Sequence, residues 1–336
     1  MYICLNIVII YINQLSNGMK TVIVLGSGNS GAGGVHDYLL SRNDFQSPFS
    51  GKEFRIVNDP DGIDDLYNAL YKNFSINISA NKIDCFKQFI RNSYNSNYNN
   101  KNKIFNKDII SLSDEFINKI SEIKYNGSPL FYFDKMSALK KIFFYFNRFF
   151  LNKNARQINL LDMTIPCEEK MFLKYAEEFL CNIYRSHKEF DKNKNIVIDQ
   201  GGNFLKPISS TKYYGENRKI VFVSRNPKAI YWSMKRRNSL SYPGNNVEIF
   251  VEWYNNIIKK INKDEFKKII HINFEYFFEN FKEEKNRLSN LLEIEIENSN
   301  YFDLSFTQKN LYKYQNNLSN DEINFIDRNI NENFKF

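Results

Sequence analysis

The sequence has few of the residues that build metal sites and disulfide frameworks. Its 336 residues include only three histidines and four cysteines. The cysteines lie far apart and form no CxxC pair, so the sequence indicates neither a zinc site nor a set of disulfides. No metal is expected, and a reduced, cytoplasmic setting fits this pattern best. The four positions are Cys4, Cys85, Cys167 and Cys181.

Apolar runs long enough to span a membrane are also missing. The run at residues 1–13 is shorter than the roughly 20 residues that cross a bilayer, and it lacks a basic leading region and a small-residue cleavage site. Met19 directly precedes a predicted strand. Residues 1–18 are therefore interpreted as an extension or a mis-assigned start, and association with a membrane is not expected.

Dense basic blocks are absent as well. The net charge of +8 favours an anionic partner such as a nucleotide, a sulfated glycan or a membrane surface. Because the basic residues are dispersed along the chain, nucleic-acid binding is not expected.

Apolar runs typical of buried strands alternate with segments of helical periodicity. This order predicts an α/β fold with three layers, α/β/α, around a mainly parallel central sheet. The predicted strands are 21–25, 53–57, 195–199, 219–224 and 268–274, and the clearest predicted helices are 35–42, 63–74, 140–151, 167–187 and 320–330, the last one capped by Ser319 or Asn320.

The middle of the chain differs in composition from the rest. Residues 91–107 are polar and Asn-rich, which predicts an exposed insertion, and residues 108–190 have mostly the pattern of amphipathic helices. We therefore expect residues 19–336 to form a single domain with a helical, Asn-rich insertion at about 91–190.

A glycine-rich loop follows the first predicted strand and precedes a helix. Backbone N–H groups and the helix dipole create an anion site at such a junction. No Lys stands where the ATPase pattern GxxxxGK[ST] requires it, so ATP hydrolysis is disfavoured. The candidate donor-binding residues of this loop are Gly26, Ser27, Gly28, Asn29, Ser30, Gly31, Ala32 and Gly33.

A second motif begins where the predicted strand 219–224 ends. Arg225-Asn226-Pro227-Lys228 follows the strand, Pro227 opens a helix, and Ser233 comes eight positions after Arg225. Together with the loop, this motif resembles the sulfotransferase family that uses 3'-phosphoadenosine-5'-phosphosulfate. In that family a strand, Arg-Asp/Asn-Pro-Lys/Arg, a helix and a Ser bind the donor's 3'-phosphate. The stretch before and after Glu275 is similar to the family's strand-Tyr-Glu-Asp-Leu segment, in which Glu275 would be structural.

The resemblance implies a fold like that of P-loop NTPases and a cytoplasmic enzyme. Such an enzyme transfers a sulfuryl group to a hydroxyl or amine of a glycan, lipid or small molecule. Arg225 and Ser233 would bind the 3'-phosphate through charge-assisted and neutral hydrogen bonds. The chain departs from the family at Asn29, where a Lys or Arg usually precedes Ser-Gly-Thr-Thr. Lys206 is a candidate for the missing cation.

Transfer to a hydroxyl or amine needs a general base for the acceptor proton. Asp199 is the first candidate, because it ends a predicted strand at the carboxyl edge where α/β sheets bind ligands. Glu53 and Asp59 flank the predicted strand 53–57, and His36 lies on the helix after the glycine-rich loop. These three residues are further candidates.

Two other functions stay open at this point. Gly26, Gly28 and Gly31 also match the GxGxxG pattern of NAD(P)- or FAD-dependent oxidoreductases, which need a ribose-binding acid at the end of the second strand. The chain has Val57-Asn58-Asp59 there. The third interpretation is a nucleotide-binding relative of sulfotransferases without catalytic activity, because the loop lacks its usual cation.

Overall fold

The structure is a computed structural model that describes residues 19–47, 53–95, 106, 108–127, 129–150, 161–238, 241–295 and 301–330. The predictions for residues 1–18 and for most of the Asn-rich segment 91–107 lie outside these residues. Internal contacts divide the chain into two compact units. The sheet unit is Met1–Val57 with Lys188–Phe336, and the inserted unit is Asn58–His187. Compactness alone does not show independent folding, so the single domain with an insertion at about 91–190 stays a prediction.

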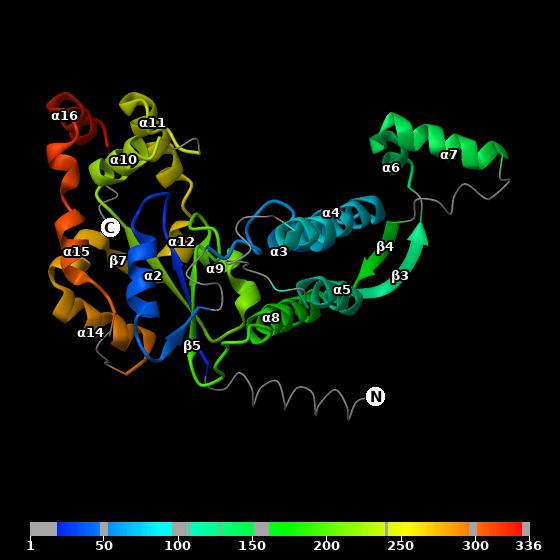
Figure 1. The fold of residues 1–336 in the computed structure, drawn as a ribbon, viewed down its shortest axis with the longest axis horizontal. Coiled ribbons are helices and arrows are strands. Elements are labelled where there is room, and N and C mark those ends of the chain that lie inside the picture. The colour runs from blue at the N-terminus through cyan, green and yellow to red at the C-terminus, as the bar shows by residue number, and fades with distance from the viewer. Residues whose placement is uncertain are drawn as a thin grey trace. The chain divides into compact units, whose positions relative to one another are not determined.

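A parallel sheet of five strands forms the centre of the sheet unit (Figure 1). The strand order is β2-β5-β1-β6-β7, and every neighbouring pair is parallel. Four of the five strands were predicted. The strands are β1 (Thr21–Leu25), β2 (Phe45–Gln46), β5 (Asn195–Asp199), β6 (Arg218–Ser224) and β7 (Ile270–Asn273).

Helices cover both faces of this sheet, which confirms the predicted α/β/α layering. Val22 and Val24 of β1 pack in a cluster with residues of α2, α13 and α14, whereas Phe222 of β6 packs in a second cluster with α10, α11 and α16. The helices of the sheet unit are α2 (Ala32–Leu40), α9 (Pro207–Ser210), α10 (Pro227–Arg236), α11 (Val247–Lys259), α12 (Lys263–Phe266), α13 (Phe274–Glu279), α14 (Phe281–Leu292), α15 (Leu304–Asn310) and α16 (Asn320–Asn329), with 3-10 turns η3 (Lys212–Tyr214) and η4 (Lys313–Asn316).

The register of the sheet brings its carboxyl ends together. Val24 of β1 lies beside Asp199 of β5, and Leu25 lies beside Phe222 of β6. The carboxyl ends of the three neighbouring strands β5, β1 and β6 therefore lie at the same end of the sheet. Residues that are far apart in the sequence meet there.

The sequence also determines where two of these helices begin. Pro227 stands in the first turn of α10, and the side chain of Asn226 accepts a hydrogen bond from the backbone of Lys228. Ser319 and Glu322 form a capping box at the start of α16, which confirms Ser319 as the cap.

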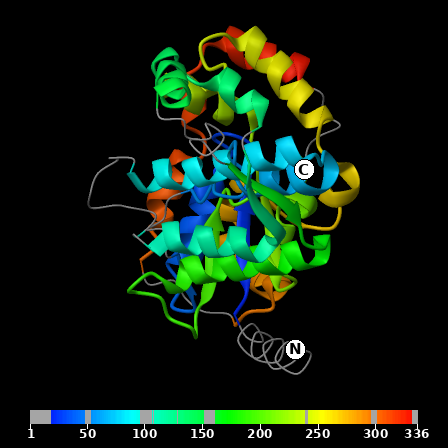
Figure 2. The ribbon, with the colours of Figure 1, turned by 90° about the vertical axis from the view of Figure 1, so that its right-hand side faces the viewer.

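The inserted unit is mostly helical, as predicted, but it also contains an antiparallel pair of strands. Helices α4, α5 and α8 lie side by side (Figures 1 and 2), and the rings of Phe116 and Phe179 stack with centroids 4.9 Å apart. Its elements are α3 (Ile63–Tyr67), the π-helix η1 (Asn68–Lys72), α4 (Ile76–Asn95), α5 (Asp108–Ile120), β3 (Ser121–Gly127), α6 (Leu130–Lys135), α7 (Ala138–Phe150), β4 (Leu161–Pro166) and α8 (Glu169–Arg185).

The predicted strand 53–57 is wrong. Residues 53–55 have no regular structure, and Ile56 and Val57 lie in a turn. Phe54 is buried, as a strand residue would be, but its backbone N–H makes a single bond to the carbonyl oxygen of Asp199 (3.0 Å) and no ladder continues from it. The second strand of the sheet is instead the two-residue β2.

None of the helices in the described ranges has the length and apolar character needed to cross a membrane.

Candidate functional site

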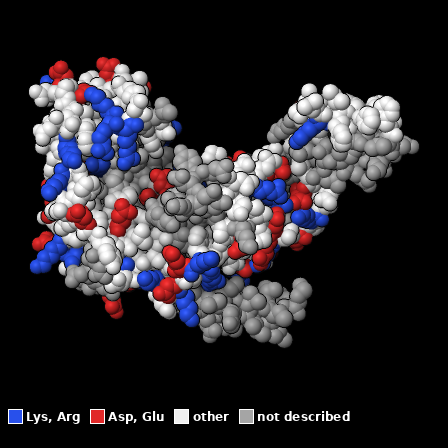
Figure 3. Space-filling view, viewed as in Figure 1, with Lys and Arg blue, Asp and Glu red and all other residues white. Residues whose placement is uncertain are grey.

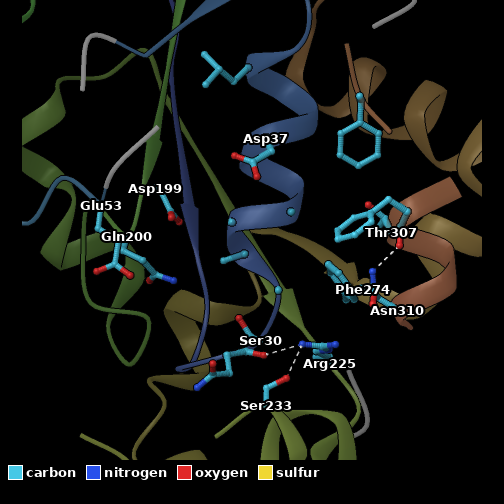
Figure 4. A pocket seen from close by; sticks show the side chains of 18 of the residues that line it. Ser30, Asp37, Glu53, Asp199, Gln200, Arg225, Ser233, Phe274, Thr307 and Asn310 are labelled. Atoms are coloured by element: carbon cyan, nitrogen blue, oxygen red, sulfur yellow. Dashed lines mark hydrogen bonds between the residues drawn. The ribbon is translucent and has the colours of Figure 1, made fainter. Parts of the chain in front are cut away.

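A cavity of about 890 Å³ lies at the carboxyl edge of the parallel sheet. Its walls come from the loop after β1, helix α2, the end of β5, the segment after β6, the end of α10 and helix α15 (Figure 4). All of its lining residues belong to the sheet unit. The position is the one where parallel α/β sheets bind ligands.

The glycine-rich loop forms one wall of this cavity. Gly31 caps α2 with a φ of +88°, and Asn29 also has a positive φ of 64°. A Cβ atom on Gly31 would overlap the ring of Phe274, so both the backbone angle and the close packing require glycine. The loop residues that line the cavity are Ser27, Asn29, Ser30, Gly31, Ala32, Gly33 and Gly34.

Two predicted loop residues lie outside the cavity wall. Gly26 packs against the side chain of Ser30, and Gly28 lies against the ring of Tyr242. Neither glycine lines the cavity. A Cβ atom at either position would overlap a neighbouring side chain, so glycine lets the loop fold tightly here, and the donor-binding roles of both residues stay predictions.

Arg225 lies directly after β6 and faces the loop. Its Nη1 donates to the carbonyl oxygen of Asn29 (3.2 Å) and to Oγ of Ser233 (3.4 Å), and its guanidinium carbon lies 4.9 Å from the centre of the Phe274 ring. Its Nε is buried and has no hydrogen-bond partner among the described residues. Burial lowers the pKa of Arg225, and Glu275 raises it.

Glu275 supports the segment that contains Arg225. Both of its carboxylate oxygens accept from the backbone N–H of Asn226 (3.2 Å each), and one of them lies 3.8 Å from Nε of Arg225. Glu275 is buried, and burial raises its pKa. These contacts fit the structural role expected for Glu275.

Two arginines that the sequence analysis did not identify also line the cavity. Arg236 and Arg237 stand at the end of α10, and the guanidinium of Arg236 lies 4.9 Å from the centre of the Trp232 ring. They follow Ser233 by three and four positions, the spacing that places side chains on one helix face. That spacing is the signal that could have identified them. Lys206, the candidate cation, is exposed at the start of α9 and does not line the cavity.

Carboxyl groups gather on another side of the cavity. Figure 4 shows Asp199, Glu53 and Gln200 together on the side of α2 away from Phe274, and Arg225 with Ser233 below the loop. Burial is the main cause that raises the pKa of Asp199, to about 6, and repulsion from Glu53 adds to it. Oδ1 of Asp199 is buried and has no hydrogen-bond partner among the described residues.

Two candidate bases do not line the cavity. His36 is fully buried in α2, with Nδ1 3.3 Å from Oδ1 of Asp37. Asp59 belongs to the inserted unit, where its carbonyl oxygen accepts from the backbone N–H of Gly62 (2.9 Å). The structure therefore brings Asp199 and Glu53 into the cavity wall with Arg225, but not His36 or Asp59, whose catalytic roles stay predictions.

Two sulfotransferases of known structure are similar to the chain. The sulfotransferase domain of the olefin synthase from Synechococcus aligns over 93% of this chain and 94% of its own, with a TM-score of 0.42 and 9% identity. A sulfotransferase from Mycobacterium avium aligns over 90% of this chain and 77% of its own, with a TM-score of 0.34 and 8% identity. Because these identities and TM-scores are low, the alignments assign neither a family nor an activity to this chain.

No family model and no curated protein matches the sequence.

The strand order of this sheet differs from that of dinucleotide-binding enzymes. In the Rossmann fold the second strand of the chain lies next to the first. Here β5 lies between β1 and β2. The predicted strand 53–57, whose end would supply the ribose-binding acid, is not a strand. The GxGxxG match therefore lacks the structural context that dinucleotide binding requires.

Proposed function

We propose that the chain is a sulfotransferase that transfers the sulfuryl group of 3'-phosphoadenosine-5'-phosphosulfate to a hydroxyl or amine. One observation carries the proposal. Arg225 and Ser233 are hydrogen-bonded to each other in the wall of a cavity that also contains the N-terminus of α2. A guanidinium and a hydroxyl at this place suit a phosphate group at a second position of the nucleotide, which ATP lacks.

The cavity fits such a donor in size and in hydrogen-bonding groups. Its volume lies within the range of about 300–1,000 Å³ that is usual for small-molecule sites. Buried polar atoms normally have partners, yet Ser30 Oγ and Arg225 Nε have none among the described residues. We infer that the loop and the N-terminus of α2 bind the 5'-phosphosulfate, while Arg225 and Ser233 bind the 3'-phosphate.

We infer that Arg236 and Arg237 replace the cation that the glycine-rich loop lacks. The loop presents Asn29 where the family has Lys or Arg, but these two guanidinium groups line the same cavity. Together with Arg225 they give three cationic side chains to the part of the cavity formed by the end of α10 and the segment after β6, which favours a phosphate group there. The proposal assigns them to charge compensation for the donor.

Asp199 is the proposed general base. During transfer, a bond forms between the acceptor's oxygen or nitrogen and sulfur, and the bond from sulfur to the phosphate oxygen breaks. The acceptor's proton passes to the carboxylate of Asp199. A pKa of about 6 leaves Asp199 ionised at neutral pH and close to the value that favours proton transfer. Glu53, beside it in the wall, raises that pKa by repulsion.

The test is a calorimetric titration with 3'-phosphoadenosine-5'-phosphate, beside adenosine 5'-phosphosulfate, ATP and NAD. We expect the wild type to prefer the ligand that has the 3'-phosphate, and Arg225→Ala to remove that preference. Truncating a buried charged partner costs about 2–5 kcal/mol, so affinity should fall at least ~30-fold. Arg328→Ala, an exposed arginine of α16 outside the cavity, is the matched control.

Binding of NAD without binding of the 3'-phosphorylated ligand would contradict the proposal. Binding of that ligand without transfer to any acceptor in a screen of alcohols and amines would indicate the non-catalytic relative.

A further inference from the structure

Helix α7 of the inserted unit exposes a continuous apolar face. Leu139, Ile142, Phe143, Phe146, Phe149 and Phe150 follow the spacing of one helix face, and each of these side chains is between 52 and 79% exposed. We call this set the α7 stripe. A surface helix of a globular protein usually packs its apolar face against the core. Here the stripe points away from it.

Contacts with α6 hold the other side of α7. The ring of Tyr145 meets the ring of Phe133 edge to face, with centroids 5.8 Å apart. Nζ of Lys141 lies 5.4 Å from the centre of the same ring and donates to the carbonyl oxygen of Asp134 (3.4 Å). Because these contacts lie on the side of α7 that carries Lys141 and Tyr145, the orientation that exposes the stripe is stabilised by α6.

Exposed apolar patches of this kind mark surfaces that bind proteins or membranes. The charge of the segment that contains α6 and α7 distinguishes a membrane from a second copy of the chain. Residues 130–150 contain Lys135, Lys140, Lys141 and Arg148 and a single acidic residue, Asp134. A second copy would carry the same excess of positive charge, which disfavours pairing of two copies through this segment. An anionic lipid surface would attract these basic groups instead.

The length of α7 fits a helix that lies on a membrane. Its 13 residues are too few to cross a bilayer. Helices with Phe and Leu on one face and basic residues on the other lie in the plane of the headgroups. We propose that α7 binds through its stripe to the surface of a bilayer that contains anionic phospholipid.

This inference differs from the sequence-based expectation that the chain does not associate with membranes. That expectation rested on the short apolar run at residues 1–13, which concerns spanning segments. A surface helix needs no such run. The inference rests on α6 and α7 and is independent of the proposed transferase activity.

The experiment is sedimentation of the full chain with large vesicles of phosphatidylcholine, alone or mixed with phosphatidylglycerol. We expect binding to the mixed vesicles, less binding as salt increases, and little binding to phosphatidylcholine alone. The loss of one Phe side chain from the lipid interface should weaken partitioning at least ~10-fold. The double variant Phe146→Ser, Phe149→Ser should therefore lower partitioning at least ~100-fold.

Phe74→Ser is the matched control, since Phe74 is an exposed phenylalanine of the same unit outside α7, and it should bind like the wild type. Failure of the wild type to bind the mixed vesicles would overturn the proposal, as would equal binding by the double variant.

Thermal unfolding and light scattering give two further tests. A lower unfolding temperature in the double variant would show that the chain itself covers the stripe. A wild-type dimer that the double variant abolishes would show that a second copy covers it. Either result would overturn the lipid assignment.

Discussion

The raised pKa of the buried Asp199 carboxyl predicts how the free energy of unfolding changes with pH, whichever acceptor the chain uses. Its pKa is about 6 in the folded chain, compared with 3.8 for an ordinary Asp. Between these two values the folded state binds the proton more tightly than the unfolded state does. The free energy of unfolding therefore falls as pH rises through this window, by ~1.36 kcal/mol per unit of pKa difference. The total is ~3 kcal/mol, and the ionised form carries that cost at neutral pH.

Asp199→Asn removes the ionisation and with it this pH dependence. Asparagine packs differently from Asp, but that difference is nearly the same at every pH and cancels when two pH values are compared. Relative to the wild type, the variant should gain ~2 kcal/mol between about pH 4.5 and about pH 8, because part of the window lies below pH 4.5. The assay is urea unfolding followed by tryptophan fluorescence. Trp232 and Trp253 are the only tryptophans, and both belong to the sheet unit.

Asp303→Asn is the matched control. Asp303 also lines the cavity, but its hydrogen bond from the backbone of Phe306 lowers its pKa. Its proton binds mainly below pH 3.8 in both the folded and the unfolded state, so its substitution should change the free energy of unfolding almost equally at about pH 4.5 and about pH 8. An equal effect of Asp199→Asn at both pH values would refute the raised pKa. If Asp199 is the base, the same variant should also lose about 10²–10⁴-fold in the rate of transfer, although it is more stable at neutral pH.

Three further predictions concern other parts of the sheet unit. Gly31→Ala forces a side chain onto a positive φ and into the Phe274 ring, so urea unfolding should show a loss of about 1–3 kcal/mol and calorimetry a loss of donor binding. Arg236→Ala and Arg237→Ala should each reduce the salt dependence of that binding, measured by titration at several ionic strengths; an unchanged dependence would place their charges outside the binding interaction. Ser319→Ala removes the capping box of α16 and should cost about 1 kcal/mol of unfolding free energy, while Ser319→Asp should retain most of it.

The strands that could be predicted from the sequence are those that helices cover on both faces of the sheet. Residues 21–25 and 219–224 form continuous apolar runs because helices cover both faces of a parallel sheet. The strand β3 could not be found in this way, because five of its seven residues are exposed and carry no apolar pattern. Residues 53–57 were wrongly predicted as a strand because an apolar residue such as Phe54 is buried both in a strand and in a packed turn.

The candidate site was predictable where a motif lies at a strand end. Asp199, Arg225 and the loop all follow buried strands, and the sheet register then brings them together. Arg236 and Arg237 follow no strand, and their place depends on where α10 ends. His36 was placed on the correct helix, but its direction depends on which face of α2 packs against the sheet.

The strand pairing also has a consequence for the order in which the chain folds. Thr21 of β1 pairs with Ile196 and with Arg218, so the central strand has no partner until the entire inserted unit has been synthesised. The contacts of that unit are closer in sequence, which favours its earlier formation. We therefore expect β1 to be the late element in refolding, and a nascent chain that ends near residue 190 to expose an unpaired apolar strand that is prone to aggregation.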